Sequence, residues 1–355
     1  MNVLVVNAGS SSLKLRLLDG HDAVVAAADL PADGDVADAL REWPAPEAVG
    51  HRVVHGGTDF ATAVRIDQRV RTRLVELTTL APLHQPKSLS ALDAVSRVLP
   101  EVPAVACFDT AFHTTIPPAA ATYAVPREWQ QRYGVRRYGF HGLSHAYCSR
   151  RAIELTGARR LVTCHLGAGA SLAAVVDGRS VDTTMGFTPL EGLVMATRSG
   201  TVDPGLVLWL EEHEHQAPQD VASALEQRSG LLALAGTADM REVEARATAG
   251  DAEARLALDV YVHRLVTSIG AMATAAGGVD GLVFTGGVGE NSAGVRYRTA
   301  ARLGHLGIAI DQARNDGDGA DRDITADGAR VRTLVIAARE DVQIARETRA
   351  ALSRG

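Results

Sequence analysis

Three short turns rich in glycine and hydroxyl residues each follow a predicted buried strand, and this pattern constrains the fold more than any other feature. The turns are residues 7–12, 165–169 and 285–291. A glycine turn at the end of a strand lets backbone N–H groups approach phosphate oxygens, because no Cβ stands in the way. A single turn of this kind is more often an ordinary strand end. Three of them in one chain favour a nucleotide-binding protein.

The segments around these turns alternate between strand and helix patterns. Apolar runs and period-two alternation predict strands at residues 3–6, 13–18, 49–55, 102–108, 161–165, 172–176, 180–184, 281–284 and 331–337. Helical spacing predicts helices at 36–43, 74–80, 88–98 and 342–353, and across most of 205–275. The second half therefore begins like the first, with strand, glycine turn, strand, turn and strand. We expect an α/β fold of two similar lobes with a central cleft between them.

Other phosphate-binding motifs do not fit the sequence. A P-loop needs Gly directly before its Lys, but the only lysines, Lys14 and Lys87, follow Leu13 and Pro86. A protein-kinase Val-Ala-x-Lys strand fails the same test. A Rossmann fingerprint fails because residues 286–289 lack its third glycine and lie far from the first strand. A phosphate grip on a hairpin in each lobe remains, which is the arrangement of the actin, Hsp70 and sugar-kinase superfamily with its actin-like (ribonuclease H-like) lobes.

Composition excludes several classes of protein. A length of 355 residues suggests about two domains. The net charge of −6 provides no basic field for a nucleic acid backbone. The three cysteines have no CxxC spacing, which argues against a disulfide framework and favours a reducing compartment. No apolar run of about 18 residues and no signal peptide are seen, so we expect a cytoplasmic protein without a membrane partner.

Several charged residues lie where a ligand could reach them. Arg52 and Arg198 have small neighbours that leave room for a carboxylate or phosphoryl group, although most arginines form surface ion pairs. Asp109 ends a buried strand, where it is either paired, bound to a metal or a helix N-cap. His141 and His145 have the i, i+4 spacing of a zinc site, but no Glu follows the first and Gly142 weakens a helix there. A phosphate-facing His141 is therefore the better interpretation.

At these segments the sequence closely resembles the acetate kinase family. The matching blocks are NAGSSSLK at 7–14, HRVVHGG at 51–57, APLHQP at 81–86, FDTAFH at 108–113, RYGFHG at 137–142, DTTMGFTPLEG at 182–192 and FTGGVGEN at 284–291. They stand in family order and cover the chain nearly from end to end. The resemblance implies reversible transfer of the ATP γ-phosphoryl group to acetate, giving acetyl phosphate and ADP, by direct in-line transfer with Mg²⁺ or Mn²⁺.

The resemblance also assigns roles to individual residues. The implied catalytic residues are Asp109, His141, Arg198, Arg52 and His84. Arg52, Val54, Leu83, Phe140 and Pro189 would bind acetate, with the apolar members around its methyl group. Asn7 and Glu340 would hold the metal. The implied nucleotide-binding residues are Ser10, Ser12, Lys14, His165, Leu166, Gly167, Ala168, Gly169, Asp239, Met240, Arg241, Gly287, Val288, Gly289, Glu290 and Asn291.

The expected domains are residues 1–113 plus 342–355 as the N-terminal lobe, and 114–341 as a C-terminal lobe. The resemblance implies that the second lobe carries the nucleotide site and the interface of a homodimer. This chain departs from the family at three points: Ala168 replaces a usual Asn, Thr201 replaces a common Asp, and Arg339 stands before Glu340 in place of Asn. The chain is also short between about residues 19 and 50. These departures bear on ATP affinity and nucleotide preference, because the phosphoryl-transfer residues are retained.

Three alternatives stay open at this point. A propionate or butyrate kinase of the same fold differs by one or two methylenes, each worth only about 1–3 kcal/mol of discrimination. Val54 and Phe140 match acetate enzymes and favour acetate. A sugar-responsive regulator on the same scaffold would need a DNA-binding module, and no basic helix-turn-helix segment is present. A catalytically impaired paralogue is disfavoured because Arg52, Asp109, His141 and Arg198 are all retained.

Overall fold

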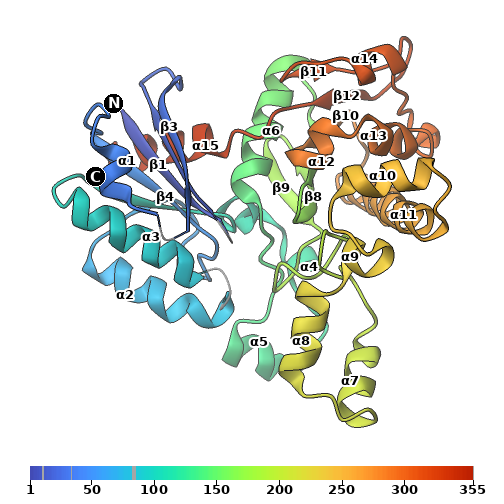
Figure 1. Ribbon diagram of the computed structural model, residues 1–355, viewed down its shortest axis with the longest axis horizontal. Coiled ribbons are helices and arrows are strands. Elements are labelled where there is room, and N and C mark those ends of the chain that lie inside the picture. Colours follow the sequence, from blue (N-terminus) through green and yellow to red (C-terminus); the bar gives the residue numbers. More distant parts are fainter. Residues whose placement is uncertain (10–11, 33, 82–84, 355) are drawn as a thin grey trace. The chain divides into compact units, whose positions relative to one another are not determined.

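The chain forms two compact units, each built around one six-stranded sheet (Figure 1). The computed structural model describes residues 1–9, 12–32, 34–81 and 85–354. Unit 1 consists of Met1–Thr114, Phe140–Tyr147 and Arg339–Gly355, and unit 2 of Thr115–Gly139 and Cys148–Ala338. Within the described ranges, no helix combines the length and apolar character needed to span a bilayer.

The sheet of unit 1 has the strand order β3-β2-β1-β4-β6-β5. β1, β4 and β6 run parallel, while β2, β3 and β5 are antiparallel to their neighbours. The strands are β1 (Val3–Ala8), β2 (Ser12–Leu18), β3 (Val24–Pro31), β4 (Ala48–Val53), β5 (Val64–Arg65) and β6 (Ala104–Phe108). The helices are α1 (Val36–Leu40), α2 (Gln68–Glu76), α3 (Gln85–Val98) and α15 (Glu340–Leu352).

Helices cover both faces of this sheet. Val3 and Val5 of β1 pack with Ile344 of α15, while Leu4 and Val6 pack with α3. The alternation follows from the two-residue period of a strand, and burial of both faces explains why β1 is apolar without interruption. The central strand is therefore fixed in register by two hydrophobic cores.

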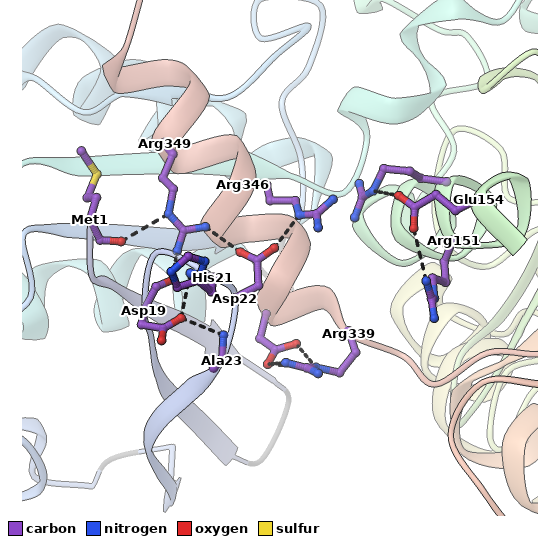
Figure 2. A network of polar contacts seen from close by, with 12 residues as sticks. Met1, Asp19, His21, Asp22, Ala23, Arg151, Glu154, Arg339, Arg346 and Arg349 are labelled. Atoms are coloured by element: carbon purple, nitrogen blue, oxygen red, sulfur yellow. Dashed lines mark hydrogen bonds and ion pairs between the residues drawn. The ribbon is translucent and has the colours of Figure 1, made fainter.

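Ion pairs hold α15 against the β2–β3 turn. Figure 2 shows Asp22 between Arg346 and Arg349 of α15, with N···O distances of 2.7 and 2.6 Å. Arg349 also donates to the backbone carbonyls of Met1 and Asp19. Asp22 adopts a left-handed conformation with φ 65° in this turn. These contacts fix the helix whose first residue is Glu340.

Unit 2 repeats the same topology with a sheet in the order β11-β12-β10-β7-β8-β9. β7, β10 and β12 run parallel, and β8, β9 and β11 are antiparallel to their neighbours. The strands are β7 (Arg160–Leu166), β8 (Ala170–Val176), β9 (Arg179–Thr183), β10 (Gly281–Thr285), β11 (Arg322–Asp323) and β12 (Arg332–Val335). The order β9-β8-β7-β10-β12 thus corresponds to β3-β2-β1-β4-β6. The structure confirms the expected pair of similar α/β lobes.

Most helices belong to unit 2. They are α4 (Pro118–Ala121), α5 (Arg127–Tyr133), α7 (Pro204–Glu212), α8 (Pro218–Gln227), α9 (Gly230–Ala235), α10 (Met240–Thr248), α11 (Ala252–Ala275), α12 (Gly286–Asn291), α13 (Ala293–Ala300) and α14 (Gln312–Asp316). Helix α6 (Gly142–Thr156) begins in unit 1 and continues in unit 2. The long helix α11 packs on β7, β8 and β9 and buries a residue every three or four positions, including Leu258, Val262, Leu265 and Ile269.

Most predicted elements are confirmed, and the exceptions include β3, residues 286–291 and the helix predicted at 74–80. Strand β3 was missed because its alanine-rich sequence has weak strand propensity and its edge position leaves it half exposed. Residues 286–291 form the short helix α12 and not a turn, since Gly286 turns the chain with φ 79° directly after β10. The helix predicted at 74–80 begins earlier, at Gln68, where Asp67 caps its N-terminus by accepting from Val70 N.

We expect acid to destabilise the protein through its buried histidines. His51, His55 and His113 are buried, and burial lowers the pKa of each to about 4. The unfolded chain takes up these protons near pH 6.5 and the folded chain does not. The free energy of unfolding therefore falls as the pH drops from about 6.5 toward 4.

Denaturant titrations of the wild type and His51→Leu at pH 7.5 and 5 test this expectation. His51 has no hydrogen-bond partner among the described residues, so its replacement breaks no hydrogen bond there. Between the two pH values the wild type should lose about 2 kcal/mol more than the variant. Equal losses would show that His51 does not remain neutral in the folded protein.

Candidate active site

Polar side chains from three parallel strands meet at one edge of the sheet in unit 1. Asn7 lies near the end of β1, Arg52 near the end of β4, and Asp109 directly after β6. The register pairs Val6 with His51 and Val53 with Phe108, so the carboxyl ends of the three strands coincide. Ligand sites of open α/β sheets form at this edge.

Arg52 and Asp109 form a buried, two-pronged ion pair. Arg52 Nη2 lies 2.5 Å and Nε 3.0 Å from Asp109 Oδ2, and the two side chains are 18% and 3% exposed. Burial raises the pKa of Asp109 and nearby Glu340 adds to this, while Arg52 opposes both. Burial also acts to lower the pKa of Arg52, but the two carboxylates outweigh it and the pKa is raised. The guanidinium is therefore permanently charged and held in one orientation.

Asn7 connects this pair to the C-terminal helix. Its Oδ1 accepts from Arg52 Nη1 at 3.2 Å, and its Nδ2 donates to Glu340 Oε2 at 3.0 Å. Glu340 is the first residue of α15, and Arg339 beside it pairs with Asp341 at 2.9 Å. Asn7, Asp109 and Glu340 together present carboxylate and amide oxygens, the donors that Mg²⁺ prefers. Within the described ranges, no group of three or more His, Cys, Asp or Glu residues could hold a metal on its own.

The β1–β2 hairpin places Lys14 beside this cluster. Lys14 is exposed and pairs across the hairpin with Asn7. The backbone N–H of Gly9 donates to the carbonyl oxygen of Ser12 at 2.8 Å, at the start of β2. Ser10 lies outside the described residues.

The segment that follows Arg52 is held by a glutamine that sequence reasoning did not select. Gln85 Oε1 accepts from His55 N, and its Nε2 donates to His55 O and Leu74 O, each at 3.3 Å. Val54 and Phe140 are buried, and the rings of His55 and Phe140 meet edge to face with centroids 5.5 Å apart. Leu83 and His84 lie outside the described residues. The one available signal was that Gln85 belongs to the block that also contains His84.

His141 stands at the beginning of α6 in a left-handed conformation with φ 56°. His113 Nε2 lies 3.0 Å from the carbonyl oxygen of Phe140, directly before it. The expectation that Gly142 weakens a helix here was wrong, because α6 starts at this residue. A Cβ on Gly142 would lie 2.3 Å from the carbonyl oxygen of Asp109. The glycine therefore allows the helix start to approach the strand end that carries Asp109.

In unit 2 the glycine turn after β7 and helix α12 after β10 lie together at the corresponding sheet edge. A Cβ on Gly286 would meet Leu166 O at 2.8 Å, and one on Gly167 would lie 4.0 Å from Gly287 N. Ala168 is exposed, and its carbonyl oxygen accepts from Ala196 N at 3.1 Å. The two glycine segments thus bring backbone N–H groups together without side chains between them.

Arg198 lies in a loop that α8 and α9 fix through backbone hydrogen bonds. Ser199 N donates to Leu225 O, and Ser229 N donates to Thr197 O. The guanidinium contacts the carbonyl oxygen of Pro189 at 3.1 Å, but no carboxylate of the described chain lies within ion-pair distance of it. Burial lowers its pKa, with Glu226 acting in the opposite direction. A half-buried cation without a counter-ion favours an anionic ligand.

Several other predicted nucleotide residues of unit 2 make local contacts. Asp239 caps α10 through Arg241 N at 2.9 Å, and its hydrogen bonds with Arg241 lower its pKa to about 2. Glu290 Oε1 accepts from Gly286 N and Ala338 N at 2.9 and 3.0 Å, so its carboxylate braces α12. Asn291 Nδ2 donates to Gly287 O at 2.8 Å.

Arg296 is a further residue that sequence reasoning missed. It is 1% exposed and donates to the carbonyl oxygens of Gly289 and Glu290 at 2.9 and 2.8 Å. It also donates to Asn315 Oδ1 and O. A buried cation at the C-terminal end of α12 complements the helix dipole and fixes the glycine segment. An arginine at helical spacing gives no sign in the sequence that it is buried.

Comparison with known proteins identifies the family. The family model described as the Acetokinase family matches residues 44–346. The chain belongs to the acetokinase family. Acetate kinase from Thermosipho africanus is 41% identical over 400 residues, covering 100% of this chain and 98% of the relative. Acetate kinase from Nostoc punctiforme is 48% identical over 321 residues, covering 88% and 78%.

Solved structures of acetate and propionate kinases have the same fold as this chain. The crystal structure of Porphyromonas gingivalis acetate kinase has a TM-score of 0.90 at 36% identity and covers 99% of both chains. A propionate kinase from Francisella tularensis has a TM-score of 0.92 at 35% identity, covering 98% of this chain and 99% of that one. The residue roles implied for this acetokinase stay predictions, because a family match assigns no individual role.

Thr201 is one of the positions at which the chain departs from the family. Its hydroxyl accepts a hydrogen bond from Gly192 N at 3.1 Å.

Removal of the two site arginines should affect stability very differently. Arg52→Ala leaves the buried Asp109 carboxylate without its partner and should lower the free energy of unfolding by about 3–5 kcal/mol. Arg198→Ala breaks no ion pair with a described residue and should cost about 1 kcal/mol. Urea titration of both variants at pH 7.5 measures the difference. Equal losses would show that the Arg52–Asp109 pair is not the stabilising contact described here.

Proposed function

We propose that this acetokinase transfers the γ-phosphoryl group of ATP reversibly to acetate, giving acetyl phosphate and ADP. The observation that carries the proposal is the Asn7–Arg52–Asp109–Glu340 cluster at the parallel-strand edge of unit 1. It occurs in a chain that aligns over its whole length with an acetate kinase.

The chemistry suits these groups. A carboxylate acceptor is already an anion, so the attack on phosphorus needs no general base. Phosphoryl transfer depends on in-line placement and on neutralising charge spread over the phosphoryl oxygens. Arg52, held by Asp109, would present its remaining N–H groups to an anion without reorganising. His141, at the start of α6, would donate to phosphoryl oxygens.

Residues of unit 2 would bind the nucleotide and the second anionic group. The turn after β7 and the start of α12 offer backbone N–H groups to phosphate oxygens. Arg198 has no counter-ion in the described chain and would take a carboxylate or phosphoryl oxygen as its partner. The resemblance to the family assigns Val54, Phe140 and Pro189 to the acetate methyl group.

Asn7 and Glu340 would hold Mg²⁺, which neutralises phosphate charge when bound. Mg²⁺ is usually held by one or two side-chain oxygens, with waters and substrate phosphates completing its octahedron. The oxygens of Asn7 and Glu340 fit this pattern. Asp109 would orient the substrate.

Propionate is the alternative acceptor, because the solved structure with a TM-score of 0.92 is a propionate kinase. Val54 and Phe140 match acetate enzymes and so favour the smaller acid, since a propionate needs space for one more methylene. The acceptor with the highest kcat/KM decides between the two.

Hydroxamate trapping of acyl phosphate tests the function. Purified protein with Mg·ATP is given acetate, propionate or butyrate in separate reactions, with Arg198→Ala as the control. We expect the strongest signal with acetate and a loss of at least about 100-fold in the variant. A stronger signal with propionate would change the acceptor. No signal with any acid, from folded protein that still binds ATP, would identify an impaired paralogue.

We further propose that the protein is a cytoplasmic homodimer that pairs through α7 of unit 2. No residue of α7 is buried, and Leu206, Leu208 and Trp209 are 46%, 55% and 46% exposed. α7 lies beside α8 at one end of unit 2 (Figure 1). Exposed apolar side chains gathered on one helix are typical of a protein interface. The described cysteines are joined by no disulfide, which supports a reducing compartment.

Light scattering after gel filtration tests the dimer. The wild type should have twice the chain mass of 37.4 kDa. Leu208→Glu should shift the mass toward one chain, because a buried charge at an interface is costly. Val75→Glu on α2 of unit 1, at a similarly exposed position, is the matched control and should stay dimeric. A dimeric Leu208→Glu protein would exclude α7 from the interface.

A further inference from the structure

The loop at residues 184–191 follows β9 and carries Pro189. It contains no helix or strand, so side chains from elsewhere must hold its backbone. The carbonyl oxygen of Pro189 accepts from Arg198 Nη1 at 3.1 Å. This loop therefore helps to fix the position of the Arg198 guanidinium.

Arg137 holds both ends of the loop. Its Nη1 donates to the carbonyl oxygens of Thr184 and Met185 at 3.2 and 3.1 Å. Its Nη2 lies 2.7 Å from Glu191 Oε1, in an ion pair whose side chains are 17% and 34% exposed. One guanidinium thus binds the first two residues of the loop and the last one.

Tyr123 fixes the middle of the loop. Its hydroxyl accepts from Phe187 N at 3.0 Å and donates to Glu191 Oε2. The guanidinium of Arg137 lies over its ring, 5.5 Å from the centroid. Tyr123, Arg137 and Glu191 therefore form one connected cluster, in which each side chain contacts the other two.

The loop passes directly over this cluster at Gly186. A Cβ there would lie 1.8 Å from Glu191 Oε2 and 2.0 Å from Tyr123 Oη. The carbonyl oxygen of Gly186 accepts from Tyr138 N and Gly139 N at 3.0 and 3.3 Å. Any other residue at this position would separate the loop from the tyrosine and the glutamate.

We propose that Tyr123, Arg137 and Glu191 are positioning residues that set the affinity for the carboxylate substrate through Pro189 and Arg198. The proposal rests on the proposed function, in which Pro189 and Arg198 bind acetate. The cluster touches neither the nucleotide turn at 165–169 nor α12 in any hydrogen bond described, so its loss should affect acetate more than ATP.

Tyr123→Phe tests the proposal, because it removes one oxygen and keeps the ring under Arg137. Steady-state kinetics should show KM for acetate raised about 5- to 20-fold and KM for ATP within about twofold of the wild type. Tyr133→Phe on α5, an exposed tyrosine of the same unit, is the matched control and should change neither constant. An unchanged KM for acetate in Tyr123→Phe, or equal changes in both constants, would overturn the proposal.

Hydrogen exchange provides a readout that needs no turnover. The Phe187 amide should exchange at least about 10-fold faster in Tyr123→Phe and at the wild-type rate in Tyr133→Phe. Unchanged exchange would show that the hydroxyl does not hold the loop. If the loop amide responds as expected but the wild type phosphorylates no acid, the proposed function fails and the positioning of the loop stands.

Glu191→Gln provides a conservative rescue. Its amide oxygen can still accept from Arg137 while the ion pair is lost, so KM for acetate should rise less than in Glu191→Ala. Equal effects of the two variants would show that these hydrogen bonds do not hold the loop, and would count against the proposal.

Discussion

Parallel pairing of strands is the constraint on which the candidate site residues of each unit depend. In unit 1, β1, β4 and β6 run in one direction, so Asn7, Arg52 and Asp109 meet at one edge although they are far apart in sequence. In unit 2, the parallel pairing of β7 with β10 brings the two glycine segments together in the same way. Because both faces of the unit 1 sheet are buried, a register shift would expose its core, and this cost keeps the strand ends aligned.

The buried and half-buried arginines differ in the groups that they contact. This difference distinguishes arginines that hold the protein together from an arginine that is available to bind a ligand. Arg52 donates most of its hydrogen bonds to Asp109 and Asn7, and Arg296 donates to backbone carbonyl oxygens and to Asn315. The guanidinium of Arg198 is half buried and donates to a carbonyl oxygen and a thioether, and no carboxylate of the described chain forms an ion pair with it. Charges fixed before the substrate arrives cost no reorganisation during the reaction, which is how electrostatic catalysis gains its effect. A cation left without a counter-ion marks where the ligand supplies one.

Sequence reasoning predicted the elements with strong periodicity and missed those without it. The buried strands of both sheets and α11 follow from apolar runs and helical spacing. Strand β3 was missed because alanines at a sheet edge have no strand signature. The start of α6 was predicted wrongly because glycine disfavours helices in general, while here it permits contact with the Asp109 carbonyl. Gln85, Arg296 and Tyr123 act through contacts with backbone atoms of other elements, and no local pattern encodes these contacts. Glu191 acts through the side chains of Tyr123 and Arg137, which lie far from it in the sequence.

The sequence by itself determined the fold class, the repeated lobe pattern and the family, because strand periodicity, glycine turns and motif order are local properties of the chain. It also determined which residues carry usable chemistry. Only the tertiary structure decided that Asp109 is paired with Arg52, that Asn7 joins Arg52 to Glu340, and that Arg198 has no counter-ion in the described chain. These outcomes depend on burial and on distances between segments separated by up to 333 positions, which arise only when the sheet and helices pack.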